Sequence, residues 1–359
     1  MVAMTAPTLD DTSTLAALAP EIARQTGATT VRIASAHLLA GGAVQQNWRI
    51  DAEVEDGPRA GRHAWVLRTD ASARIAVSLD RETEAKVLRA AHAGGVLVAE
   101  PLAVGSSGSA LAKPYVVQPW LEGSAQARRI VRDPALARFG DDLARALAAE
   151  LAKIHAIAPP RAELACLPVP ILPPARAEIA RFRAALNNSG DARPALEYIL
   201  AWLDANAPAA RTLALVHGDF RTGNYLVHDG RLTGILDWEF AHWGDPDEDI
   251  GWLTARCWRF GNDNLEAGGI AALGVFLDAY TKASGRKVSA DAVRYWQIMA
   301  AAKWAVIAVL QGDRFRLGGE QRLELALTGL MPPEMEHDAL SDILAWRESS
   351  GGKGGPKWQ

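Results

Sequence analysis

The most informative segment of the chain is LVHGDFRTGNYLVHDGRLTGILDWEFAHWGDPDEDIGW, at residues 215–252. It contains a His-Gly-Asp triplet that ends at Asp219, then Asn224 on the same tight loop, and then Asp237 on the adjoining hairpin. Carboxylate and amide oxygens brought together in this way suit Mg²⁺, an ion that also binds phosphate oxygens. The carboxylate of Asp219 would then be free to orient a hydroxyl group and accept its proton. The segment therefore predicts a site for phosphoryl transfer.

Upstream of this segment, the first third of the chain has the pattern of strands around one helix, preceded by a further helical run at 10–27. The helix among the strands is expected to begin at the N-cap residue Asp80 and to stop at the glycine pair 94–95. Strands are expected at 31–40, 47–54, 63–69, 101–105 and 114–119. This pattern predicts a five-stranded antiparallel sheet with one helix.

The remainder of the chain reads mostly as helices, so the fold class is α+β with two lobes. Helices are expected at 136–157, 174–187, 192–205, 246–260, 265–284, 289–312 and 320–328. Short strand-like runs are expected between them at 213–216, 225–228 and 232–236. The change of pattern predicts an N-terminal lobe at 1–119, a mainly helical C-terminal lobe at 120–348, and a hinge at 118–123. The glycine-rich tail at 349–359 is expected to be disordered.

The composition is that of an ordinary globular protein: 359 residues, of which 49% are hydrophobic and 22% charged, with a net charge of -4. This balance gives no general attraction to nucleic acid or to an anionic membrane, so we expect neither as a partner. Cys166 and Cys257 are too far apart for a CxxC zinc or disulfide motif. Residues 1–20 lack the pattern of a secretion signal, and a cytoplasmic location is expected. The sequence leaves the oligomeric state open.

Three motifs resemble one known family. HGDFRTGN at 217–224 is similar to the HGDxxxxN catalytic loop of the aminoglycoside phosphotransferase family, also called the phosphotransferase enzyme family. ILDWE at 235–239 resembles that family's metal-binding segment, and GDPDEDIGWL at 244–253 matches the stretch that follows it. The resemblance covers residues 30–330 and implies a protein-kinase-like two-lobed fold.

The resemblance also implies roles for single residues. Asp219 would be the catalytic base, and Asn224 and Asp237 would hold magnesium. Asp249 would brace the catalytic loop from behind. The N-terminal lobe would bind ATP, and the C-terminal lobe would hold the acceptor. The sequence does not decide between ATP and GTP.

In this family, the third strand carries a basic residue that contacts the ATP phosphates and pairs with a glutamate on the following helix. Arg68 in WVLRTD and Glu84 in RETEAKVLRA fall at these places. Arg68 departs from the pattern, because many relatives have lysine there. A guanidinium can still clamp phosphates, although its geometry differs from that of an ammonium. Glu82 is a rival partner for Arg68, since it lies on the same helix two residues earlier.

Two backbone segments are expected to contact the nucleotide. At the hinge, the backbone groups of Gln118 and Trp120 are expected to meet adenine, while Pro119 removes one donor. The turn between the first two strands lacks the G-x-G-x-x-G spacing, so its phosphate contacts would come from backbone N–H groups. The residues concerned are Gly42, Ala43 and Val44.

The favoured function is an ATP- and Mg²⁺-dependent O-phosphotransferase that acts on a hydroxyl of a small molecule. The motifs look most similar to the kinase domains found joined to acyl-CoA dehydrogenases, which suggests a hydroxylated acyl or otherwise apolar acceptor. Choline-like, macrolide and aminoglycoside acceptors stay open, as does the choice between a resistance and a metabolic role. One alternative is a catalytically silent nucleotide-binding module, a pseudokinase. Another is a metal-dependent hydrolase built on His217, Asp219 and Asp237.

Other polar and aromatic residues are expected to be structural. His217 is expected to be a buried, hydrogen-bonded histidine, and His155 a packed histidine at a helix end. Most tryptophans of the helical lobe should lie in its core, with some lining an acceptor pocket. Four arginines in this lobe argue mildly against a polycationic acceptor: Arg256, Arg259, Arg314 and Arg316.

Overall fold

The N-terminal strands form one antiparallel sheet in the order β1-β2-β3-β5-β4. The computed structural model describes residue 9 and residues 12–39, 45–70, 78–209 and 213–349. The strands are Val31–Leu38 (β1), Gln45–Val54 (β2), Gly61–Asp70 (β3), Ala103–Gly105 (β4) and Tyr115–Pro119 (β5). The predicted five-stranded antiparallel sheet is therefore confirmed. The expected phosphate contacts of Gly42, Ala43 and Val44 lie outside the described residues.

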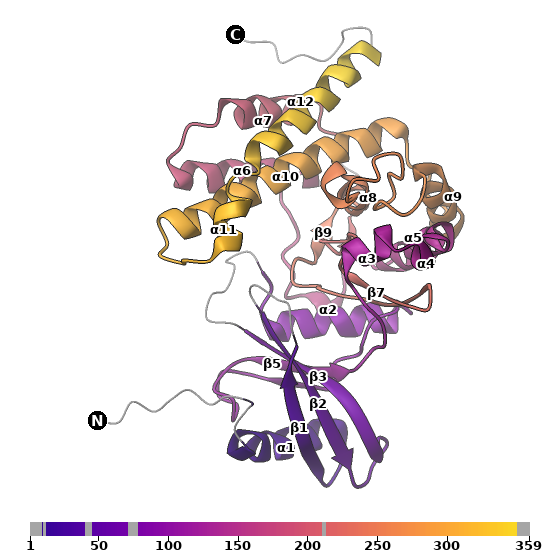
Figure 1. Cartoon of the computed structure of the whole chain (residues 1–359), viewed down its shortest axis with the longest axis vertical. Helices are drawn as coiled ribbons and strands as arrows, with labels where there is room; N and C mark the ends of the chain where they lie inside the picture. The colour runs from indigo at the N-terminus through magenta and orange to yellow at the C-terminus, as the bar shows by residue number, and fades with distance from the viewer. Residues whose placement is uncertain (1–8, 10–11, 40–44, 71–77, 210–212, 350–359) are drawn as a thin grey trace.

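Alternation along the strands gives the sheet one apolar face. In β3, Trp65 and Leu67 are buried and belong to the same core cluster as Ile50 of β2. Helix α1 (Thr12–Thr26) covers this face with Leu18 and Ile22, which are completely buried. Figure 1 shows α1 against the sheet, at the end of the molecule farthest from the helical lobe.

Helix α2 (Arg81–Ala93) begins as the sequence predicts. The Asp80 side chain accepts a hydrogen bond from the Thr83 backbone N–H at 2.8 Å, and the helix is capped at its C-terminal end by Gly94. Its buried residues Val87 and Leu88 join the core of the helical lobe rather than that of the sheet. Helix α2 therefore lies between the sheet and the helical lobe (Figure 1).

Most of the remaining chain is helical, as expected. Two cores hold this part together, one around α5 and α9 and the other around the long helix α10. The helices are α3 (Ala127–Arg132), α4 (Pro134–Ala137), α5 (Gly140–His155), α6 (Pro174–Ser189), α7 (Pro194–Ala205), α8 (Asp247–Thr254), α9 (Leu273–Ser284), α10 (Ala290–Arg316), α11 (Leu323–Thr328) and α12 (Pro332–Ser349). None of the helices within the described ranges is long and apolar enough to cross a membrane.

Two small two-stranded sheets, one of them a hairpin, hold the segment at residues 215–252. Strand β7 (Tyr225–His228) pairs with β8 (Arg231–Ile235), and β6 (Ala214–Val216) pairs with β9 (His242–Gly244). The loop that carries Asp219 and Asn224 runs from β6 to β7, and Asp237 follows the end of β8 after Leu236. The residues named by the motif are therefore brought together by two neighbouring strand pairs.

Several helix boundaries differ from the sequence-based expectation. The run at 265–284 becomes helical only at Leu273, because Gly268 and Gly269 adopt positive φ angles of 62° and 78°, which a right-handed helix does not allow. The run at 136–157 starts as a helix at Gly140, after the separate short helices α3 and α4. The run at 246–260 ends its α-helix at Thr254 and continues as a 3₁₀ turn. Helix α12 and strand β9 were not predicted.

Candidate active site

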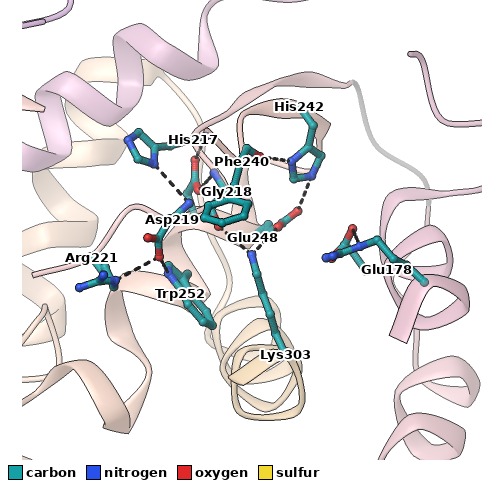
Figure 2. Close-up of polar contacts among 12 residues, drawn as sticks. Glu178, His217, Gly218, Asp219, Arg221, Phe240, His242, Glu248, Trp252 and Lys303 are labelled. Atoms are coloured by element: carbon teal, nitrogen blue, oxygen red, sulfur yellow. Dashed lines mark hydrogen bonds and ion pairs between the residues drawn. The ribbon is translucent and has the colours of Figure 1, made fainter. Parts of the chain in front are cut away.

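Asp219 lies on the loop between β6 and β7, with its carboxylate held by three side chains. Its Oδ1 accepts hydrogen bonds from the Trp252 indole Nε1 at 2.6 Å and from Arg221 Nε at 3.1 Å. Its Oδ2 accepts a hydrogen bond from Asn224 Nδ2 at 2.5 Å. Figure 2 shows Arg221 and Trp252 meeting the carboxylate on the same side. Donors from different parts of the chain thus fix the orientation of the carboxylate.

The residue before Asp219 is held from several directions. Gly218 has a φ of 76°, and a Cβ there would lie 2.3 Å from the Phe240 carbonyl oxygen, so only glycine fits. Its N–H donates to Asp249 Oδ1 at 2.9 Å, and the N–H of His217 donates to Asp249 Oδ2 at 2.7 Å. Asp249 of α8 therefore braces the loop from behind, as the family resemblance implies.

Asp249 is itself a buried carboxylate. Burial on its own would raise the pKa of Asp249, but hydrogen bonds and charge from His155 and His217 outweigh this effect and lower it. His155, at the end of α5, lies between Asp249 Oδ2 at 3.2 Å and the Tyr280 hydroxyl at 2.7 Å. This confirms His155 as a packed histidine at a helix end, where it supports the brace of the catalytic loop.

Asp237 and Arg68 join the two lobes. Arg68 of β3 lies 3.2 Å from Asp237 Oδ1 and 2.9 Å from Glu84 Oε1 of α2. Burial on its own would lower the pKa of the Arg68 guanidinium, but the carboxylates of Glu84 and Asp237 outweigh this effect and raise it. Asp237 has a φ of 59°, rare for a non-glycine residue, and its side chain is 44% exposed. The backbone thus presents an accessible carboxylate next to a buried guanidinium.

The choice between Glu84 and Glu82 as the partner of Arg68 is settled by burial. Glu84 is only 1% exposed and also pairs with Arg81 at 2.6 Å. Glu82 points outward, is 73% exposed and pairs with Lys86 at 2.8 Å. Positions two apart on a helix face different directions, so one glutamate alone can reach β3.

We expect Glu84→Gln to lower the free energy of unfolding by about 3 kcal/mol, because the change leaves two buried guanidinium groups short of negative charge. Glu82→Gln on the same helix is the matched control, and it should change the free energy by less than about 0.5 kcal/mol. Urea unfolding of both variants measures the difference. Equal destabilisation by the two substitutions would show that the buried position of Glu84 does not matter.

The side-chain oxygen atoms of Asn224 and Asp237 are of the type that binds magnesium. The Asn224 amide nitrogen is used on Asp219, both at its carboxylate and at its carbonyl oxygen at 3.0 Å, which leaves the Asn224 amide oxygen to act as a ligand. Asp237 follows Leu236, whose N–H donates to the Asn224 carbonyl oxygen at 2.8 Å, and its carboxylate is accessible. Hard oxygen donors are the ligands that Mg²⁺ takes. Within the described part of the chain, no group of three or more His, Cys, Asp and Glu side chains is placed to hold a metal ion.

His217 is a structural histidine, as predicted. Its ring is completely buried, with Nε2 at 2.8 Å from the Leu236 carbonyl oxygen and Nδ1 accepting from the Asp219 backbone N–H at 3.2 Å. Burial lowers the pKa of His217 despite the nearby carboxylates. Both ring nitrogens are therefore engaged by the backbone, which argues against a metal-dependent hydrolase built on this residue.

The hinge requires a correction to the expected backbone contacts. The Trp120 N–H donates to the Ala64 carbonyl oxygen at 3.0 Å, within the sheet. Gln118 pairs with Val66 in the same register, so the backbone groups of Gln118 and Trp120 face β3. The prediction that both residues present their backbone groups to adenine is therefore wrong by one position. The backbone groups of alternate residues in a strand point to opposite edges. The groups that face away from β3 are therefore those of Pro119 and Leu121.

Three residues around Asp219 were not predicted as site residues: Arg221, Trp252 and Lys303. Trp252 was expected only as one of several tryptophans of the helical lobe. Arg221 follows Asp219 by two residues and stacks over the Trp258 ring, with 4.3 Å between its guanidinium carbon and the ring centroid. Arg221 and Trp252 lie within the segment at 215–252, and this position was the one sequence signal that could have pointed to them. Lys303 lies far outside the segment and has no such signal.

The four arginines that the sequence singles out in the helical lobe form ion pairs within the protein. Arg256 pairs with Asp342 at 3.0 Å, Arg314 with Glu320 at 2.7 Å, and Arg316 with Asp191 at 2.8 Å. Arg259 is buried and also pairs with a carboxylate. These ion pairs explain the four arginines without an acceptor.

A sheet with a buried arginine–glutamate pair, joined to a helical lobe that carries a His-Gly-Asp loop, defines a protein-kinase-like phosphotransferase. Residues 16–286 match the model of the family described as "Phosphotransferase enzyme family". The chain belongs to this family, and its class is that of the small-molecule kinases.

Individual relatives agree with the fold. A crystal structure from Ralstonia eutropha, of a candidate aminoglycoside phosphotransferase, superposes with a TM-score of 0.69 at 19% identity, covering 92% of this chain and 98% of that one. An aminoglycoside phosphotransferase solved with AMP-PNP and hygromycin B gives a TM-score of 0.56 at 16% identity, covering 93% of this chain and 98% of that one. Acyl-CoA dehydrogenase family member 11 of Gallus gallus is 30% identical over 208 residues, which are 54% of this chain. The match spans only 25% of that relative's length.

Proposed function

We propose that this chain transfers the γ-phosphate of ATP to a hydroxyl group of a small molecule, with Asp219 as the catalytic base. The observation that carries the proposal is the Asp219 carboxylate, which is oriented by three donors, one of them Asn224. A base held in a fixed direction can accept the proton of a hydroxyl group as the oxygen attacks phosphorus. This arrangement favours an active enzyme over the pseudokinase alternative, because each named motif residue is present and positioned.

Asn224 and Asp237 would hold Mg²⁺, which when bound neutralises charge on the phosphate oxygens. Arg68 offers a second positive charge at the same place, since its guanidinium already contacts Asp237. Its partner Glu84 fixes the guanidinium so that it is oriented before the nucleotide binds.

At the hinge, the carbonyl of Pro119 and the N–H of Leu121 replace Gln118 and Trp120 as the expected adenine contacts. A proline at the first of these positions costs nothing, because only its carbonyl is used.

The acceptor would bind beside Asp219 and Trp252, where the structure has a small cavity of about 10 Å³ that would have to widen to admit it. The pocket is lined by Glu178, Glu248, Trp252, Trp296, Met299, Ala300 and Lys303. Both carboxylates already have cationic partners: Glu178 pairs with Arg181, and Glu248 pairs with His242 and Lys303. A polycationic acceptor would therefore find no unpaired carboxylate in this lining, and the buried Trp296 and Met299 make the wall behind it apolar. This favours the hydroxylated acyl or otherwise apolar acceptor over an aminoglycoside.

A thermal-shift titration with ATP, GTP and ADP, each with and without Mg²⁺, tests the nucleotide part of the proposal. ATP with Mg²⁺ should stabilise the native state by about 2.7 kcal/mol at a hundredfold excess over Kd, and raise Tm accordingly. A larger shift with GTP would change the donor but keep the reaction. The absence of any shift at nucleotide concentrations above about 1 mM, the upper range of common KM values, would overturn the kinase proposal.

A further inference from the structure

Lys303 reaches the catalytic loop from the middle of α10. Its Nζ donates to the Gly218 carbonyl oxygen at 2.7 Å and lies 3.4 Å from Glu248 Oε1. The same ammonium sits over the Trp252 ring, 4.6 Å from its centroid. Its side chain is only 12% exposed. Figure 2 shows Lys303 extending from its helix towards Gly218, with Glu248 and Trp252 on either side.

The surroundings of Lys303 hold its side chain in place. Glu248 and Trp252 are four residues apart on α8 and so share one face of that helix. Glu248 is held in turn by His242, whose Nε2 lies 3.2 Å from Glu248 Oε2 and whose Nδ1 contacts the Phe240 carbonyl oxygen at 2.9 Å. Burial on its own would lower the pKa of His242, but Glu248 outweighs this effect and raises it to about 9. A buried ammonium is costly to desolvate, and these carboxylate and ring contacts offset that cost.

We propose that Lys303 is a positioning residue that holds Asp219 in its reactive orientation. This inference rests on the proposed role of Asp219 as base. Lys303 acts along two routes: it fixes the carbonyl of Gly218, the residue before Asp219, and it packs on Trp252, which donates to Asp219 Oδ1 at 2.6 Å. Together with Asp249, which accepts from the Gly218 N–H, it clamps both backbone polar groups of Gly218.

One of the two residues that hold Gly218, Lys303, lies outside the part of the chain that matches the family model. Asp249 lies within residues 16–286, which match the family model, whereas Lys303 lies beyond them on α10. Lys303 also lines the proposed acceptor pocket with Glu248 and Trp252. A ligand that displaces Lys303 from Gly218 would therefore change the orientation of the base, and this links the occupancy of the pocket to the catalytic loop.

Lys303→Met tests the proposal, because methionine keeps much of the aliphatic stem and removes the ammonium. Hydrogen–deuterium exchange of the backbone at 217–224 should become roughly tenfold faster in this variant, since the Gly218 carbonyl loses its donor. ADP release from MgATP, with water as acceptor, should fall about tenfold to a hundredfold, while the KM for ATP changes little. Lys303→Arg, which keeps a cation, should restore part of both losses.

Lys282→Met removes an exposed lysine of α9 and serves as the matched control, which should leave loop exchange and ADP release unchanged. If Lys303→Met speeds exchange only along α10 and lowers Tm, Lys303 is merely structural and the proposal is overturned. Faster loop exchange with unchanged ADP release would also overturn it, because the loop order would then not serve the reaction. A wild-type chain that fails to bind ATP defeats the proposed function instead, and the exchange measurement still decides whether Lys303 orders the loop.

Discussion

Asp219→Asn is expected to lower the rate of phosphoryl transfer by about 10³-fold, within the range that a positioned general base contributes. Asparagine has nearly the same shape as aspartate and can still accept hydrogen bonds from Trp252 and Arg221 through its amide oxygen. Its NH2 group takes the place of Oδ2, so the Asn224 amide nitrogen loses this acceptor and the Asn224 side chain has to turn. Asparagine at position 219 cannot accept a proton from a hydroxyl group at neutral pH. The variant should therefore keep its fold and its ATP-induced thermal shift while losing transfer.

The control for this variant is Asp229→Asn on the turn between β7 and β8. The Asp229 side chain is 89% exposed and its φ is 47°, a conformation that asparagine tolerates as well as aspartate. The same chemical change there should leave turnover and Tm unaltered. Steady-state measurement of ADP formation compares the two variants. Turnover near the wild-type level in Asp219→Asn would show that another group takes the proton.

The parts of this site that the sequence predicted are those carried by a local motif. Asp219, Asn224 and Asp237 lie within 19 residues of one another, and the loop and hairpin between them are short enough to be inferred from turn and strand patterns. Arg68 and Glu84 came from the family resemblance, which implies a basic residue on the third strand and a glutamate on the helix that follows it. Glu84 rather than Glu82 could be chosen only once the rotation of α2 against β3 was known.

The parts that the sequence did not predict depend on long-range packing. Lys303 is 85 residues from Gly218, and a lysine in a helix has no pattern that marks it as a contact of a distant loop. Trp252 is one of twelve tryptophans, and only the packing of α8 against the loop singles it out. The hinge error has a different cause. Strand register decides which backbone groups face the nucleotide, and a shift of one residue reverses them.

Asp237→Asn is expected to remove the magnesium-dependent part of ATP binding and to lower transfer by about 10³-fold or more, as the loss of an electrostatic contribution to phosphoryl transfer would. Asparagine tolerates the positive φ of this position, so the backbone of the segment should be preserved. The neutral amide is a weaker ligand for a divalent cation than a carboxylate is. Arg68 loses one carboxylate partner but keeps Glu84, and the fold should persist.

The sign of the effect without magnesium distinguishes a metal ligand from a merely structural aspartate. In the wild type, the Asp237 carboxylate, which pairs with Arg68, would repel the phosphates of metal-free ATP and compete with them for this guanidinium. In Asp237→Asn, the thermal shift with ATP alone should therefore be equal or larger, while the additional shift on adding Mg²⁺ disappears.

Calorimetric titration of both proteins with ATP, at matched ionic strength, measures the two contributions separately, with Asp229→Asn again as the control. If the variant keeps the full magnesium-dependent increment, the ligand must be sought elsewhere. If it loses binding under both conditions, Asp237 supports the fold of the nucleotide site rather than the metal.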